Sequence, residues 1–229
     1  MGIAFFDLDK TLLSVNSGWL WLRRELSLGH VSRTQALRAS TWLIRYHLGF
    51  AKMEVAIGQA ISLLAGTGEA ELRARTTDFY REQVRRLYRP GALAALDWHK
   101  RRGDQRVLLT SSSGYLSELV ARELQLDEIL CNRFEVDLAG LHTGRSLGAL
   151  CFGKGKLAHA RAYAERIQSP LAEATFYTDS YSDLPVLEAV RRPVAVNPDP
   201  RLRRLAFRRK WEIVDWGVAS PREALPSVG

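Results

Sequence analysis

The chain of 229 residues is long enough for one large domain or for a medium-sized domain with an insertion. Its formal charge of +8 favours anionic partners, but no helix-turn-helix, zinc-finger or RNA-recognition motif accompanies the arginines, so we expect no nucleic-acid partner. Two cysteines are too few for a disulfide framework, and no segment resembles a secretion signal or a transmembrane helix, so we expect a soluble, cytoplasmic protein with reduced thiols.

The first half of the chain is predicted to be mostly helical. A short apolar run over residues 3–6 predicts a buried strand. Helices are then expected over 17–29, 32–49, 52–66 and 69–88, with no strand between them. We therefore interpret residues 13–88 as one helical segment.

From residue 90 onward, helices alternate with short β-runs. In chain order we expect a helix over 93–102, a strand over 106–110, a helix over 115–124, a β-run over 129–136, a turn-rich hairpin over 137–150, a helix over 155–167, a strand over 175–178, a helix over 184–190, a strand over 194–196, a helix from 199 and a β-run over 212–214. This alternation predicts an α/β fold, with a Rossmann-like parallel sheet and helices on both faces. The first strand belongs to that sheet, so we expect a core of residues 1–12 and 89–229, interrupted by an all-helical cap of residues 13–88.

Two aspartates, Asp7 and Asp9, follow the first strand directly. Parallel strands place ligands beyond their carboxyl ends, and two carboxylates so close together favour a bound cation or a shared proton. Taken alone, the pair is equally typical of an ordinary turn at a strand end.

Three later segments also place residues that can bind an anion or a cation after an apolar strand or at the start of a helix. Thr110 and Ser111 begin a run of hydroxyl residues before a helix, which suits an anion. Asp179 and Asp183 follow the strand over 175–178 and supply oxygen ligands of the kind that hard cations prefer. The run Gly153-Lys154-Gly155-Lys156 opens a helix and offers two lysines to a phosphate.

These four segments resemble, in order and spacing, the four motifs of the haloacid dehalogenase superfamily of phosphohydrolases. The helical segment after the first motif makes the phosphoserine phosphatase-like branch the most similar. The resemblance implies that Asp7 is the nucleophile, forming an aspartyl-phosphate, and that Asp9 is the general acid and base. It further implies a Mg²⁺ ion held by Asp7, Asp9, Asp179 and Asp183, and a phosphate held by Thr110, Ser111 and Lys156, with Lys154 as the alternative lysine.

The resemblance is weaker at the positions that recognise the substrate. Phosphoserine phosphatases hold the substrate ammonium with a glutamate and its carboxylate with an arginine, and these positions align here with Asn16 and Ala60. An amino-acid ligand would leave two charges without partners, so we expect a Mg²⁺-dependent phosphomonoesterase that is not optimised for phosphoserine. Candidate substrate contacts in the cap are Asn16, Trp19, Trp42 and Tyr46. Aromatic residues at helical spacing are, however, more often core residues.

Several alternatives stay open at this point. The substrate is expected to be a small phosphorylated metabolite, and phosphoserine, histidinol phosphate and a lipid headgroup phosphate all fit that description. A phosphotransferase that uses the same aspartyl-phosphate is the second hypothesis. A non-catalytic signalling module is the third, and the presence of Asp9 argues against it because binding alone does not need a general acid.

Overall fold

The computed structural model describes residues 2–30 and 53–218. The helix expected over 32–49 lies outside the described residues, as do Trp42 and Tyr46. None of the helices in the described ranges is long and apolar enough to span a membrane.

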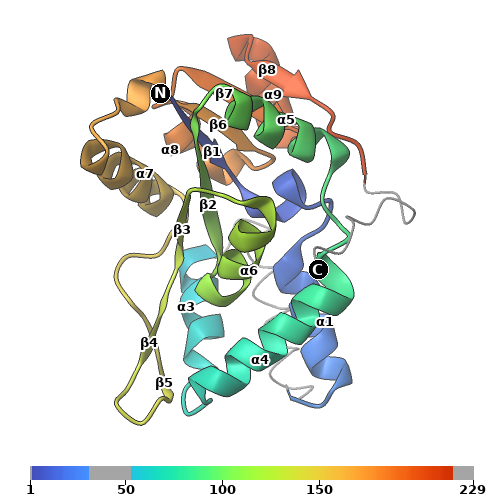
Figure 1. The fold of residues 1–229 in the computed structure, drawn as a ribbon, viewed down its shortest axis with the longest axis vertical. Coiled ribbons are helices and arrows are strands. Elements are labelled where there is room, and N and C mark those ends of the chain that lie inside the picture. Colours follow the sequence, from blue (N-terminus) through green and yellow to red (C-terminus); the bar gives the residue numbers. More distant parts are fainter. Residues whose placement is uncertain (1, 31–52, 219–229) are drawn as a thin grey trace.

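A six-stranded parallel sheet forms the centre of the molecule, with the strand order β3-β2-β1-β6-β7-β8 (Figure 1). Its strands are β1 (Ile3–Phe6), β2 (Gln105–Ser113), β3 (Glu128–Asn132), β6 (Thr175–Thr178), β7 (Arg192–Val196) and β8 (Glu212–Val214). The first strand is central, because Phe6 pairs with Leu108 on one side and with Tyr177 on the other. The register therefore brings the residues that follow β1, β2 and β6 to the same edge of the sheet.

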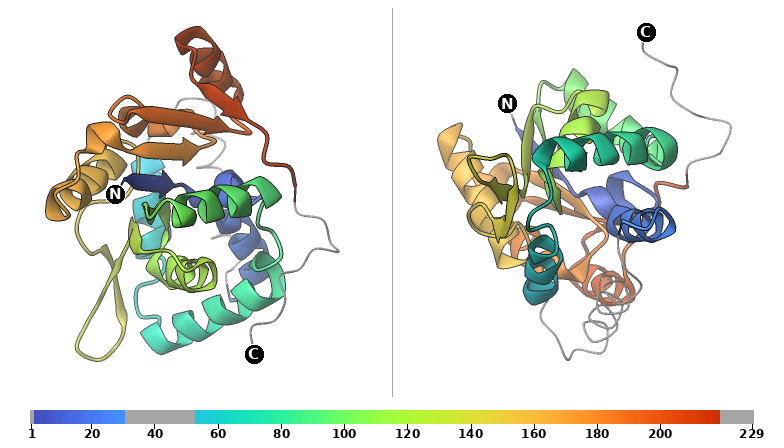
Figure 2. Two further views of the ribbon diagram at one scale, coloured as in Figure 1. Left: turned by 45° about the horizontal axis from the view of Figure 1, so that its top comes forward. Right: turned by 90° about the horizontal axis from the view of Figure 1, so that it is seen from below.

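Helices cover both faces of this sheet (Figure 2). They are α5 (Pro90–Arg101), α6 (Gly114–Leu124), α7 (Lys154–Arg166), α8 (Leu184–Leu187) and α9 (Pro200–Arg209), with short 3-10 turns η3 (Leu171–Glu173) and η4 (Tyr181–Asp183). Successive strand residues point to opposite faces, so Phe6 joins one apolar core and Phe5 joins the other. The predicted Rossmann-like α/β fold is confirmed.

Between β1 and α5, the residues that the structure describes form helices and helical turns but no strand. These include α1 (Ser17–Ser27), α3 (Met53–Ser62), α4 (Glu69–Phe79) and the π-helical turn η2 (Tyr80–Val84). The chain leaves and rejoins the sheet region at neighbouring points, because Leu13 and Tyr88 form an antiparallel bridge. The division of the chain into a core and a cap at these points stays a prediction.

A separate two-stranded hairpin, β4 (Phe134–Val136) and β5 (His142–Ser146), extends beyond the sheet (Figure 1). It contacts the loop between α3 and α4: Gly66 N donates to His142 O at 2.8 Å, and His142 N donates to Thr67 O at 2.9 Å. The single β-run predicted over 129–136 was wrong in one respect. The structure has two strands there, β3 and β4, which are separated by Arg133 and belong to different sheets.

Two local features near the sheet edge go beyond the prediction. Strand β2 continues to Ser113, three residues beyond its predicted end at Thr110. Residues Leu8–Leu12 form a turn, η1, which is closed by π-type hydrogen bonds although Asp9 and Lys10 have non-helical backbone angles. Within it Lys10 has φ 57°, a left-handed conformation that is unfavourable for a side chain with a Cβ atom.

Candidate active site

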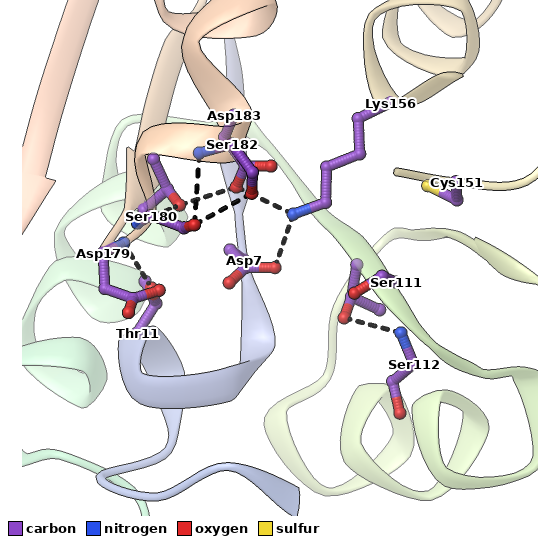
Figure 3. Close-up of polar contacts among 12 residues, drawn as sticks. Asp7, Thr11, Ser111, Ser112, Cys151, Lys156, Asp179, Ser180, Ser182 and Asp183 are labelled. Carbon is purple, nitrogen blue, oxygen red and sulfur yellow. Dashed lines mark hydrogen bonds and ion pairs between the residues drawn. The ribbon is translucent and has the colours of Figure 1, made fainter. Parts of the chain in front are cut away.

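Lys156 lies between two carboxylates at the carboxyl end of β1 (Figure 3). Its Nζ atom is 2.7 Å from Asp7 Oδ1 and 2.8 Å from Asp183 Oδ2, and all three side chains are buried. Residues from β1, α7 and η4 therefore meet in one ion-pair network. Lys154, the alternative lysine, is exposed.

The turn before α7 requires glycine at two positions. Gly153 has φ 51°, which favours a residue without a Cβ atom. A Cβ atom at Gly155 would lie 1.9 Å from the backbone oxygen of Leu150, a distance that no side chain tolerates. This close approach sets the direction in which α7 begins and so brings Lys156 into the site.

Asp9 connects the site to the first inserted helix. Its Oδ1 atom accepts a hydrogen bond from the backbone N–H of Ser17 at 2.7 Å, and Ser17 is the first residue of α1. Burial raises the pKa of Asp9, although the hydrogen bonds from Ser17 act in the opposite direction. The predicted general acid therefore lies against the amino end of a helix that belongs to the insertion.

Asp179 and Asp183 are fixed by different partners. The backbone N–H of Asp179 donates to Thr11 Oγ1 at 3.0 Å, which joins the end of β6 to η1. Asp183 Oδ2 accepts from Thr178 Oγ1 at 2.7 Å as well as from Lys156. Its other oxygen, Oδ1, is buried without a hydrogen-bond partner in the described part of the chain.

The site has an excess of negative charge. Burial, together with the nearby charges of Asp183 and Asp9, raises the pKa of Asp7 to about 7 despite the opposing effect of Lys156. Burial and the charges of Asp7 and Asp183 raise the pKa of Asp179 to about 8. Burial lowers the pKa of Lys156, but the two carboxylates outweigh this effect and keep the lysine charged. The arrangement needs a further cation to keep its carboxylates ionised at neutral pH.

The oxygen donors present suit Mg²⁺. A hard divalent cation takes carboxylate and carbonyl oxygens and retains several water ligands. The Mg²⁺ ligands that the resemblance implies are the carboxylates of Asp7 and Asp179 and the backbone carbonyl of Asp9. Asp183 would lie outside these direct ligands. Residues 2–30 and 53–218 contain no cluster of three or more His, Cys, Asp or Glu side chains suited to a metal, so the Mg²⁺ site stays a prediction.

Thr110 and Ser111 lie in the last part of β2. In the view of Figure 3, Ser111 lies on the other side of Asp7 from Asp179. Thr110 is buried, and its Oγ1 atom accepts from Ser112 N at 3.1 Å. The sequence analysis missed Asn132, whose side chain donates to Ser111 O at 2.6 Å and accepts from Cys151 N at 2.8 Å. No local pattern in the sequence pointed to Asn132, which joins the last part of β2 to the segment that leads into α7.

Two of the predicted substrate contacts, Asn16 and Trp19, lie at the exposed start of α1. Asn16 is exposed and caps α1, its Oδ1 atom accepting from Trp19 N at 2.8 Å. Trp19 is 43% exposed. Their role in substrate binding stays a prediction.

The sequence model of the haloacid dehalogenase-like hydrolases matches residues 4–188. The chain belongs to this family. A protein of Mycobacterium tuberculosis named phosphoserine phosphatase is 34% identical over 98% of this chain and 74% of its own length. A histidinol-phosphatase of Neisseria meningitidis is 26% identical over 93% of this chain and 98% of its own length. These relatives place the chain among the phosphatases of the family and confirm the resemblance.

Solved structures share the fold of this chain. A protein of unknown function from Bordetella pertussis has a TM-score of 0.86 and 31% identity, covering 94% of this chain and 98% of that one. A phosphoserine phosphatase in a phospho-aspartyl intermediate analogue form has a TM-score of 0.69 at 17% identity, covering 95% of this chain and 94% of that one. The second comparison supports the fold alone.

Proposed function

We propose that this protein is a cytoplasmic, Mg²⁺-dependent phosphomonoesterase that acts on a small phosphorylated metabolite through an aspartyl-phosphate on Asp7. The single observation that supports this best is the buried network of Asp7, Lys156 and Asp183 at the end of the central strand, with Asp9 two residues further along. A nucleophile, a cation for the phosphate and a second carboxylate are the groups that this reaction requires.

In the proposed mechanism, a carboxylate oxygen of Asp7 forms a bond to phosphorus as the bond to the ester oxygen breaks. Asp9 protonates the departing alcohol and then takes a proton from the water that hydrolyses the aspartyl-phosphate. Lys156, with Thr110 and Ser111, binds the phosphate oxygens and stabilises their charge. A bound Mg²⁺ would neutralise charge between nucleophile and phosphate, held by Asp7, Asp9 and Asp179.

The residues around the site argue against phosphoserine as the best substrate. Asn16 and Ala60 replace the two charged groups that recognise an amino acid in phosphoserine phosphatases, and Asn16 is already engaged as a helix cap. Histidinol phosphate, an amino alcohol ester without a carboxylate, fits the remaining groups better. We therefore propose a substrate other than phosphoserine.

Release of inorganic phosphate from a panel of phosphomonoesters tests this function, with Mg²⁺ or with EDTA. We expect turnover in wild type with Mg²⁺ and a loss of at least about 1,000-fold in Asp7→Asn, which lacks the nucleophile. Asp97→Asn, the same change on an exposed face of α5, is the matched control. Turnover that persists in Asp7→Asn contradicts the proposal. Phosphate found on an organic acceptor instead of free in solution favours the phosphotransferase.

A further inference from the structure

Glu54, the second residue of α3, brings a carboxylate from the insertion to the rim of the site. Its Oε1 atom lies 3.9 Å from the position that a Cβ atom would take at Gly153. The backbone oxygen of Ser182 lies 3.8 Å from that same position. Gly153 begins the turn that leads to Lys156, and Ser182 precedes Asp183. Glu54 is therefore beside the two segments that hold the ion-pair network.

The carboxylate of Glu54 has no partner among the residues that the structure describes. It is exposed, and no described side chain or backbone group forms a hydrogen bond or an ion pair with it. Four other acids of the insertion are engaged: Glu25, Glu69, Glu71 and Glu82 each pair with an arginine. Glu54 thus differs from them in having both oxygens available.

A free carboxylate beside the site would favour some substrates over others on electrostatic grounds. It repels the phosphate dianion, and the amino end of α7 offsets part of that repulsion. The same charge attracts a positive group on the part of the substrate that projects away from the phosphate. An ester with such a group gains an interaction that a neutral ester lacks.

We infer that Glu54 selects phosphomonoesters whose organic part carries an ammonium or similar cation close to the ester oxygen. This inference rests on the proposed function, because it assigns the substrate class of the same site. The phosphate would bind at Lys156, and the cation would lie towards α3, between the insertion and the turn at Gly153.

A different role for Glu54 predicts a different pattern of kinetics. Lys154 is exposed and follows Gly153 directly, so an ion pair between Glu54 and Lys154 could join α3 to the core during turnover. In that case Glu54→Gln would affect every ester equally, and Lys154→Met would have the same effect. Selection of a cation instead predicts a loss that depends on the charge of the substrate.

Phosphoethanolamine and propyl phosphate form a suitable pair of substrates, because they differ mainly in an ammonium group in place of a methyl group. We expect Glu54→Gln to lower the ratio of kcat/KM for phosphoethanolamine to kcat/KM for propyl phosphate about 10-fold, which corresponds to about 1.4 kcal/mol, with no loss for propyl phosphate. Glu54→Lys should reverse the preference. Asp78→Asn, at an exposed acid of α4, is the control and should change neither substrate.

The outcomes separate this inference from the proposed function. If wild type hydrolyses both esters and Glu54→Gln changes both equally, the inference is overturned and the phosphatase stands. The same holds if wild type hydrolyses propyl phosphate as well as phosphoethanolamine. No release from these esters or from p-nitrophenyl phosphate, by folded protein with Mg²⁺, overturns the proposed function and the inference together.

Discussion

Lys156 is the residue whose environment explains most about the site. It is only 2% exposed, and it is held by two carboxylates that come from opposite ends of the sequence. Removing one partner of a buried ion pair leaves an uncompensated charge, which is more costly than losing the attraction itself. The same lysine therefore contributes to folding and, in the proposed mechanism, to phosphate binding.

Lys156→Met tests both contributions. We expect a loss of about 3 kcal/mol in the free energy of unfolding, because Asp7 and Asp183 are left without their cation, and a loss of phosphatase activity. Chemical denaturation and phosphate release measure the two effects. Lys154→Met is the control, since its side chain is exposed. A stable and active Lys156→Met protein would show that the other lysine fills the role.

Asp179→Asn tests the metal site through stability. Ligand binding stabilises a folded protein by about 2.7 kcal/mol at 100 times the dissociation constant, so Mg²⁺ should raise the melting temperature of wild type. The variant should lose this increase. Without metal it should be at least as stable as wild type, because the charges of Asp7 and Asp183 disfavour an ionised Asp179. An equal Mg²⁺-induced shift in both proteins would exclude Asp179 as a ligand.

The residues that carry charge were predictable, whereas those that connect segments were not. Asp7, Asp179 and Lys156 follow short apolar runs or glycines, so their position at the strand ends could be inferred from local pattern. Asn132 and Thr11 act through single hydrogen bonds to residues that are distant in sequence. No local pattern indicates such partners, because the sheet register determines them.

At the scale of elements, the start of α7 depends on Gly155. Gly155→Ala would place a methyl group against the Leu150 carbonyl, so the turn must shift. We expect a loss of about 1–3 kcal/mol in unfolding free energy and weaker phosphate binding, because Lys156 moves with the helix. Thermal denaturation and KM measure this. Gly58→Ala in α3, where a Cβ atom meets nothing within 4 Å, is the control and should not destabilise the protein. Unchanged stability in Gly155→Ala would contradict the steric argument.

The contact between α5, β2 and β6 is sensitive to pH through His99. Its ring lies between Asp104 at 2.8 Å and Tyr177 Oη at 3.0 Å, so a neutral ring can donate to the carboxylate and accept from the hydroxyl. Burial lowers the pKa of His99 and outweighs the opposing effect of Asp104. As the pH falls, the unfolded chain therefore takes up a proton before the folded protein does. This contribution to stability is present above about pH 6.5 and is lost as the pH falls through the folded-state pKa.

His99→Gln should be less stable than wild type by about 1–2 kcal/mol at pH 8, because hydrogen bonds to buried groups are lost. The difference should narrow below pH 6.5, since only wild type has a histidine that resists protonation at this position. Denaturation curves of both proteins between pH 5 and pH 8 give this difference in unfolding free energy. Other titrating groups affect both proteins alike, so their contribution cancels in the difference. A difference that does not change with pH would contradict this account.

The order and type of the elements followed from the sequence because apolar runs and glycines separate them clearly. Their ends were less accurate where tertiary contacts extend or interrupt an element. Strand β2 continues past its apolar run because Ser113 pairs with Asn132 of β3. The turn over Leu8–Leu12 forms because Leu12 N and Leu13 N reach back to Asp7 O and Leu8 O, and no propensity predicts that geometry.

At the scale of the whole molecule, ion pairs join the α4 side of the insertion to the rest of the protein. Helix α4 and the adjoining η2 turn are joined to α6 by Arg73–Glu118 at 2.7 Å and Arg85–Glu123 at 3.0 Å. The hairpin holds the loop between α3 and α4 through main-chain hydrogen bonds. Any closure over the site should therefore leave α4 close to α6.

Hydrogen exchange with and without orthovanadate, a mimic of the transferred phosphoryl group, tests this expectation. Amides of α1 and α3 should gain protection when the site is filled, because Ser17 and Glu54 border it. Amides of α4 should change little. Asp7→Asn, which should bind the mimic poorly, provides the control. An equal gain of protection in α4 would show that the insertion moves as one body.

The position of β1 also affects how the protein is made. Lys156 lies 149 positions after Asp7, and Asp179 lies 168 positions after Thr11. At about 5–20 residues per second on the ribosome, roughly 7–34 seconds pass between the synthesis of the first strand and the synthesis of the partners that complete its site. Both of its edges are filled by strands synthesised later, β2 and then β6. Until then this apolar strand has unpaired edges, so a chain that stalls in translation is inactive and prone to aggregate.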